Sequence, residues 1–113
     1  MATLATQSVS TAGLAPSYAS AAGGGDKCRP GEHTFLHVVN GGGGSINVTV
    51  NDPNSQNPGN AASFNPDLVV AVGAGANKMI GPLKASRFRD ASDGLVAISY
   101  SGVSSVTVAV IAA

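Results

Sequence analysis

Apolar and polar residues alternate with a period of two along much of this chain. The alternation is clearest where Ile46, Val48 and Val50 take every second position among polar neighbours. Side chains of a strand point alternately to its two faces, so this pattern predicts half-buried β-strands. Three segments carry it most clearly: residues 34–40, 45–51 and 105–111.

The remaining segments predict shorter or less regular elements. The apolar run of residues 67–72 predicts a strand that is buried on both faces. Residues 78–83 predict an edge strand, because Pro82 has no N–H to donate to a neighbouring strand. Residues 85–90 predict one helical turn before an Asp-Gly turn, and residues 52–66 predict an exposed polar loop.

Two glycine-containing segments indicate how the strands connect. Residues 41–44 are four consecutive glycines, which predict a hairpin between the strands on either side. Residues 101–104 predict a second hairpin, between a strand at 95–100 and the strand at 105–111. Six short strands without a long helix predict an all-β protein, a small antiparallel β-sandwich or barrel with an extended N-terminal arm.

The arm comprises residues 1–30 and precedes a β domain at residues 31–113. Its residues are mostly Ala, Ser, Thr and Gly, without a helical stripe, and a glycine triplet at 23–25 provides backbone freedom. We expect the arm to become ordered only where it lies on another protein. A few larger side chains are its candidate partner-binding residues: Leu4, Leu14, Pro16 and Tyr18.

Charge and length limit the classes of function. Six Lys and Arg balance six Asp and Glu in a chain of 113 residues. Nucleic-acid binding usually requires a basic surface, so we expect no nucleic-acid partner. No run of eighteen apolar residues exists, so we expect no membrane partner. One small core with no Trp supplies little stability, which favours a homo-oligomer.

Candidate chemistry is sparse. His33 and His37 lie about 13 Å apart on an extended strand, too far to share one metal ion; we expect His37 to be partly buried and hydrogen-bonded. The single Cys28 has no neighbouring His or Cys. Gly73 and Gly75 resemble the start of a dinucleotide fingerprint, but Lys78 stands where a third small residue is needed. We therefore predict no catalytic residue, no metal and no cofactor, and hence no enzyme.

Several short stretches resemble small virion proteins of tailed phages that infect actinobacteria. The similar stretches are Met1-Ala2-Thr3-Leu4-Ala5-Thr6-Gln7-Ser8, Ala12-Gly13-Leu14-Ala15-Pro16, Thr34-Phe35-Leu36-His37-Val38-Val39-Asn40-Gly41, Met79-Ile80-Gly81-Pro82 and Ser99-Tyr100-Ser101-Gly102-Val103. The resemblance implies a capsid decoration, or cement, protein on the outer surface of the virion. Its implied partner is the major capsid protein, and its implied oligomer is a trimer. Another virion subunit, such as a tail-tube, head–tail connector or fibre-base protein, is the alternative, and a carbohydrate-binding module is disfavoured because no Trp is present.

Overall fold

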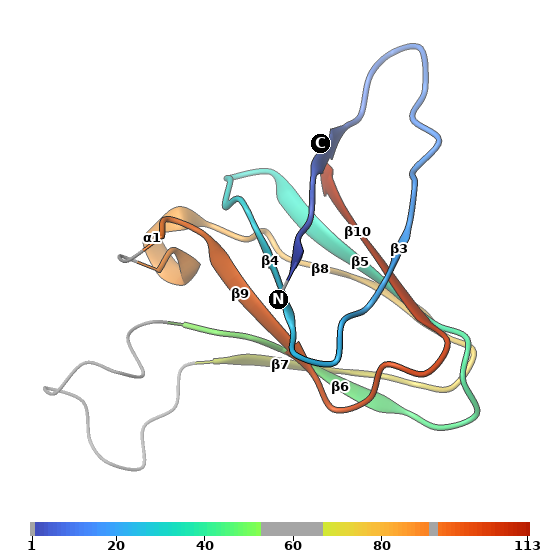
Figure 1. The fold of residues 1–113 in the computed structure, drawn as a ribbon. Coiled ribbons are helices and arrows are strands. Elements are labelled where there is room, and N and C mark those ends of the chain that lie inside the picture. Colours follow the sequence, from blue (N-terminus) through green and yellow to red (C-terminus); the bar gives the residue numbers. More distant parts are fainter. Residues whose placement is uncertain (1, 53–66, 91–92) are drawn as a thin grey trace, which may run out of the picture.

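Two β-sheets form the protein, as Figure 1 shows. The computed structural model describes residues 2–52, 67–90 and 93–113. One sheet has the strand order β1-β4-β9-β6-β7, and the other has the order β2-β10-β5-β8, with β3 also paired to β10. The strands are β1 (Ala2–Thr3), β2 (Thr6–Ser8), β3 (Ala19–Ser20), β4 (Asp26–Cys28), β5 (Thr34–Asn40), β6 (Ile46–Val50), β7 (Leu68–Val72), β8 (Asn77–Ile80), β9 (Val96–Tyr100) and β10 (Val106–Ala112). The predicted all-β sandwich is confirmed.

The core lies between the two sheets and follows the alternation in the sequence. Along β5, every second residue from Thr34 to Asn40 is buried, and β6 buries Ile46, Val48 and Val50. Aliphatic side chains from both sheets form one cluster. Those that are at most 1% exposed are Leu36, Val38, Val48, Val50, Val72, Leu83, Val96, Ile98, Val106, Val108 and Val110.

Both predicted hairpins are wrong. β5 pairs with β8 and β10, whereas β6 pairs with β7 and β9, so the four glycines at 41–44 carry the chain from one sheet to the other. Residues 101–104 do the same between β9 and β10. The error has a physical cause. Two strands with one apolar face each can bury it equally well as neighbours in a sheet or by facing each other across the core.

Asn40 fixes the first of these crossings. Its side chain is 1% exposed and bonds three backbone groups. The Nδ2 amide donates to the carbonyl oxygens of Gly44 at 2.8 Å and Val72 at 3.1 Å, and Oδ1 accepts from the Gly42 N–H at 3.0 Å. Gly44 ends the crossing and Val72 ends β7, so one buried amide joins the ends of strands in both sheets.

The two strands that follow the polar loop lie at sheet edges. β7 is not buried on both faces as predicted, because Val69 is 55% exposed and Ala71 is also exposed. β8 occupies the edge of its sheet, which confirms the edge-strand prediction. The glycine segment between β7 and β8 forms a turn, with Ala76 N donating to Gly73 O at 3.0 Å. The predicted loop itself lies mainly at 53–66, outside the described residues.

The extended N-terminal arm is not confirmed. The first three strands pair with strands of the same chain: β1 with β4 in parallel, β2 with β10 in parallel and β3 with β10 in antiparallel orientation. β4 lies between β1 and β9, and its Cys28 is 0% exposed. Small residues permit this close pairing, so a composition that suggested an unfolded arm also suits strands packed against an existing sheet.

A single helical turn, α1 (Ala85–Phe88), confirms the predicted helix and buries Phe88. The Asp-Gly turn after it is also confirmed, with Gly94 at φ +73° and Leu95 N donating to Asp93 Oδ1 at 2.9 Å. In the part of the chain that the structure describes, no helix has the length and apolarity to cross a bilayer.

Candidate partner-binding site

A loop at residues 9–16, here called the N-terminal loop, projects beyond the two sheets (Figure 1). It begins after β2 and ends before β3, and both strands pair with the same edge of β10. Ser8 lies opposite Ala112 and Ala19 lies opposite Val108, so the chain leaves β10 and returns to it four residues away. The loop is therefore anchored at both ends on one central strand.

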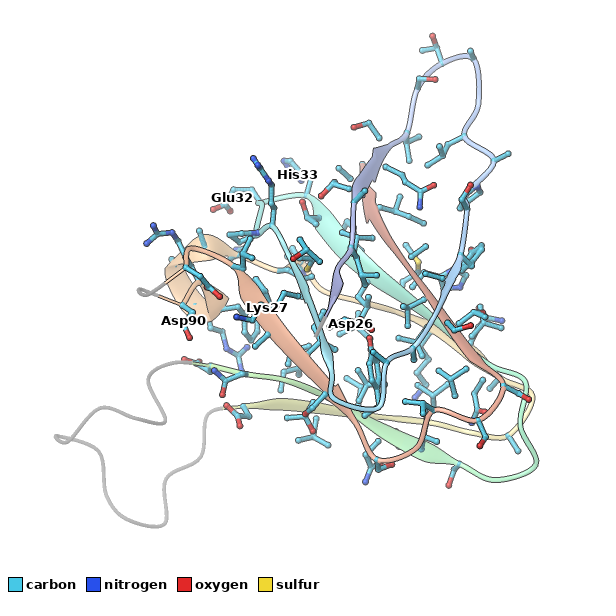
Figure 2. The ribbon with its side chains drawn as sticks, viewed as in Figure 1. Asp26, Lys27, Glu32, His33 and Asp90 are labelled. Carbon is cyan, nitrogen blue, oxygen red and sulfur yellow. The ribbon has the colours of Figure 1, made fainter. Side chains whose placement is uncertain are left out.

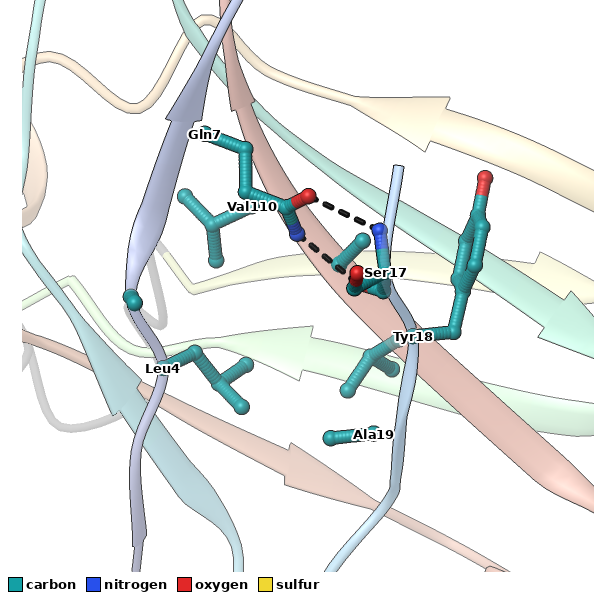
Figure 3. A pocket seen from close by; sticks show the side chains of 9 residues that line it. Leu4, Gln7, Ser17, Tyr18, Ala19 and Val110 are labelled. Atoms are coloured by element: carbon teal, nitrogen blue, oxygen red, sulfur yellow. Dashed lines mark hydrogen bonds between the residues drawn. The ribbon is translucent and has the colours of Figure 1, made fainter. Parts of the chain in front are cut away.

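A side chain closes the base of the N-terminal loop. The Gln7 amide donates from Nε2 to Ser17 O at 2.7 Å and accepts the Ser17 N–H on Oε1 at 2.8 Å, as the dashed lines in Figure 3 show. These two bonds copy the paired bonds of adjacent antiparallel strands. Within the loop, Gly13 adopts φ +90° and donates its N–H to Ser10 O at 3.0 Å. The loop therefore has defined geometry before any partner binds.

The structure separates the four predicted arm residues. Leu4 is partly buried and packs against the protein's own core. Leu14 and Pro16 lie half-buried on the N-terminal loop, and Tyr18 follows it with 40% exposure. Val9, at the start of the loop, is 54% exposed and is not among the residues that the sequence analysis named. Contact of these residues with a partner stays a prediction.

Tyr18 holds the end of the loop to the outer face of the second sheet. Its Oη lies 2.6 Å from His37 Nδ1, and the two rings meet edge-on with centroids 5.5 Å apart. The other ring nitrogen, Nε2, lies 3.0 Å from Asn77 Oδ1. A neutral imidazole that carries its proton on Nε2 satisfies both contacts, because Tyr18 then donates to Nδ1. The prediction of a partly buried, hydrogen-bonded His37 is confirmed.

An open hollow of about 370 Å³ lies below the Gln7 bridge, between β2 and β3 (Figure 3). The β10 edge forms its floor between the two pairing regions, and its walls are mostly small or apolar side chains, with Gln7 the larger polar one. Its lining residues are Leu4, Ala5, Gln7, Ser17, Tyr18, Ala19, Val108, Ala109 and Val110. The hollow has the size and polarity to receive one or two apolar side chains.

Charged residues lie away from the N-terminal loop. The sequence has no Asp, Glu, Lys or Arg before Asp26, and Figure 2 shows Lys27, Glu32, His33 and Asp90 on another part of the molecule. Among the described residues, no three His, Cys, Asp or Glu side chains gather in a way that could hold a metal ion. The N-terminal loop can therefore recognise a partner through shape, apolar contact and backbone hydrogen bonds.

The carboxylate of Asp93 gives one stability prediction. Its hydrogen bond with Lys27 lowers the pKa of Asp93 below 3.8 and raises the pKa of Lys27 above 10.5. A carboxyl group whose pKa is lower in the folded protein than in the unfolded chain stabilises the fold at pH values above its unfolded-state pKa. This stabilisation is lost as the pH falls through its folded-state pKa. We expect Asp93→Asn to lower the urea midpoint slightly at neutral pH, and to have no effect in acid where Asp93 is protonated.

The exposed Glu32→Gln variant is the matched control, because it removes one negative charge without this bond. Urea unfolding of both variants and the wild type at neutral and strongly acidic pH measures the difference. If Asp93→Asn lowers the urea midpoint by the same amount in strong acid as at neutral pH, the ionised Asp93 carboxylate is not the source of the stabilisation.

Comparison with known proteins identifies no relative. No family model, no curated protein and no solved structure matches this chain.

Proposed function

We propose that this protein is a viral capsid decoration protein that binds the outer surface of a phage head and stabilises contacts between capsomers. The observation that supports this most strongly is the N-terminal loop: an uncharged, projecting segment with an exposed Val9, half-buried Leu14 and Pro16, and a base fixed by hydrogen bonds. Its partner is the major capsid protein. On this proposal the protein acts at the virion surface by binding, without catalysing a reaction.

Binding by a preformed loop costs less conformational entropy than binding by an unfolded arm. Ordering a free chain costs about 1–2 kcal/mol per residue at the moment of binding. Here the pairing of β2 and β3 with β10 fixes the ends of the loop during folding. Contacts of Val9, Leu14 and Pro16 with the capsid then contribute to affinity without first offsetting the cost of ordering the loop. Many copies on one lattice add to a stable coat even when each contact is weak.

The copies are proposed to gather in threes on the lattice, around three-fold or quasi-three-fold positions. The shell sets this arrangement, since each loop needs one capsid site and the sites repeat with the symmetry of the lattice. The absence of charge on residues 1–25 supports such crowding, because neighbouring N-terminal segments meet without electrostatic repulsion.

The test is binding of purified protein to expanded, undecorated heads of the phage that encodes it. We expect Val9→Ser/Leu14→Ser to weaken the binding affinity at least about tenfold, because two lost apolar contacts are worth on the order of 1.5–3 kcal/mol. Met79→Ser is the matched control, since Met79 is 52% exposed on β8, against 54% for Val9. Equal occupancy of the loop variant and the control contradicts the role of the loop.

The position of the protein on virions separates this proposal from its alternative. Cryo-microscopy of particles with a labelled chain should show regular coverage of the head. A ring at a single vertex, or label along the tail, would instead assign the chain to a connector, tail-tube or fibre-base subunit.

A further inference from the structure

The outer edge of β7 differs from the other sheet edges. β1, β2 and β3 are edge strands of two or three residues, and β8 carries Lys78. Short strands and lysines are common protections against unwanted strand pairing. β7 has neither: it presents five aliphatic residues, Leu-Val-Val-Ala-Val, without a charge. Within the described part of the chain, no strand pairs with its outer edge.

The hydrogen-bond pattern identifies which backbone groups of β7 face outward. The Asn47 carbonyl on β6 accepts from Ser101 N at 2.9 Å. Asn51, the residue just after β6, donates its N–H to Ala97 O on β9, also at 2.9 Å. The backbone N–H and C=O groups of odd-numbered residues in this segment therefore point toward β9. Those of the even-numbered residues of β6 point toward β7. Val48 lies opposite Val70, so Val70 points its N–H and C=O toward β6.

The alternation then turns the backbone groups of Val69 and Ala71 away from β6, to the open edge. Their side chains are also exposed, on the outer face of the sheet. Two N–H donors and two C=O acceptors thus lie in one row along the open edge. Their spacing is the one that a neighbouring antiparallel strand requires for pairing.

We propose that β7 pairs antiparallel with β7 of a second copy, about a two-fold axis at Val70. In this register Val69 of each copy lies opposite Ala71 of the other. Each such pair exchanges two backbone hydrogen bonds, so the outward groups of both residues are satisfied in both copies. The two five-stranded sheets then form one continuous sheet of ten strands.

Charge favours a second copy as the occupant. Residues 68–77 contain no charged side chain, so two copies oppose no like charges in this register. Asp67, just before β7, accepts the Asp52 N–H on Oδ1 at 2.7 Å, and would lie opposite Gly73 of the other copy. An isologous pair of this kind is self-complementary by symmetry. It does not depend on capsid binding, and it can join copies that belong to neighbouring groups of three.

The experiment is sedimentation velocity of the free full-length protein over a concentration series, with no capsid present. We expect the wild type to approach twice the monomer mass as concentration rises. Val69→Lys/Ala71→Lys places like charges directly opposite each other in both pairs, and should weaken dimerisation about tenfold or more. Val69→Lys/Ala71→Glu places opposite charges in the same two pairs, and should restore dimerisation.

The control is Asn47→Lys/Ser99→Lys, which adds the same charge to exposed positions on interior strands of the same sheet. It should dimerise like the wild type, and circular dichroism should show all variants folded. A wild type that stays monomeric at every concentration overturns the proposal. Equal weakening by the Lys/Lys and Lys/Glu variants overturns the register. Neither result bears on capsid binding, which is measured separately with loop variants.

Discussion

Replacing Asn40 by Asp should lower the free energy of unfolding by about 3–5 kcal/mol, enough to unfold much of a small domain. The Asn40 amide donates two hydrogen bonds to the carbonyls of Gly44 and Val72 in a site that is 1% exposed. A carboxylate would turn a negatively charged oxygen toward both carbonyls. The substitution changes one atom and almost no volume, so the loss would come from electrostatics and hydrogen bonding, with packing unchanged.

Asn47→Asp is the matched control, because Asn47 is exposed on β6 and the chemical change is identical. Urea unfolding at neutral pH should place Asn47→Asp within about 0.5 kcal/mol of the wild type. Similar small losses for both variants would show that the Asn40 bonds do not hold the crossing between the sheets.

The alternation of side chains predicted strands and their faces correctly, but it could not predict their neighbours. It placed Leu36 and Val38 on one face of β5 and Ile46 on the inner face of β6. Pairing depends on which backbone edges meet, and the N–H and C=O groups are the same at every residue. The side chain that directs the crossing, Asn40, immediately precedes the four glycines; its place on the same face of the predicted strand as Leu36 and Val38 was the sequence signal for a buried Asn at a bend.

The sequence indicated only part of the candidate partner-binding site, and partner contact there stays a prediction. Leu14, Pro16 and Tyr18 were selected by size from a segment of small residues, and they lie on or beside the N-terminal loop. The bridge from Gln7 to Ser17 spans ten residues, and the contact from Tyr18 to His37 spans nineteen. Neither spacing belongs to a local motif. Such contacts exist only because β2 and β3 share the same edge of β10, which is a property of the tertiary fold.

The segment before residue 30 also contributes polar contacts inside the protein. Asp26 is 1% exposed, and its Oδ2 accepts from Tyr100 Oη at 2.8 Å and from the Ala22 N–H at 3.3 Å. The partnership with Asp26, together with burial, raises the pKa of Tyr100 well above its ordinary value, with burial the larger cause. An aspartate, a tyrosine and a cysteine from two strands thus form one interior group, in which β4 is an integral strand of the sheet.

Cys28 gives the sharpest measurement of this arrangement. Burial, with a smaller contribution from the Asp26 charge, raises the pKa of the Cys28 thiol from 9.0 to about 12. Because the thiolate is the reactive form, the reactive fraction at pH 8 falls from roughly one in ten to one in ten thousand. We expect Cys28 of the folded protein to react with Ellman's reagent at least about thirtyfold more slowly than an exposed thiol, because the side chain is 0% exposed and its thiolate is scarce, although a thiolate of higher pKa is more nucleophilic. Full reactivity should appear in urea.

Cys28→Ser/Ser99→Cys is the control, since it moves the thiol to an exposed position on β9, the strand that pairs with β4. The two proteins should differ sharply in native buffer and react alike in urea. The result decides between two arrangements of the chain. An arm that detaches before residue 31 would leave Cys28 in water and reacting as fast as the control thiol, whereas a slow thiol requires β4 to stay paired with β9. In the second case residues 26–28 belong to the folded sheet, so a boundary between arm and domain at residue 30 is excluded; the N-terminal loop itself is held by β2 and β3 on β10 of the other sheet.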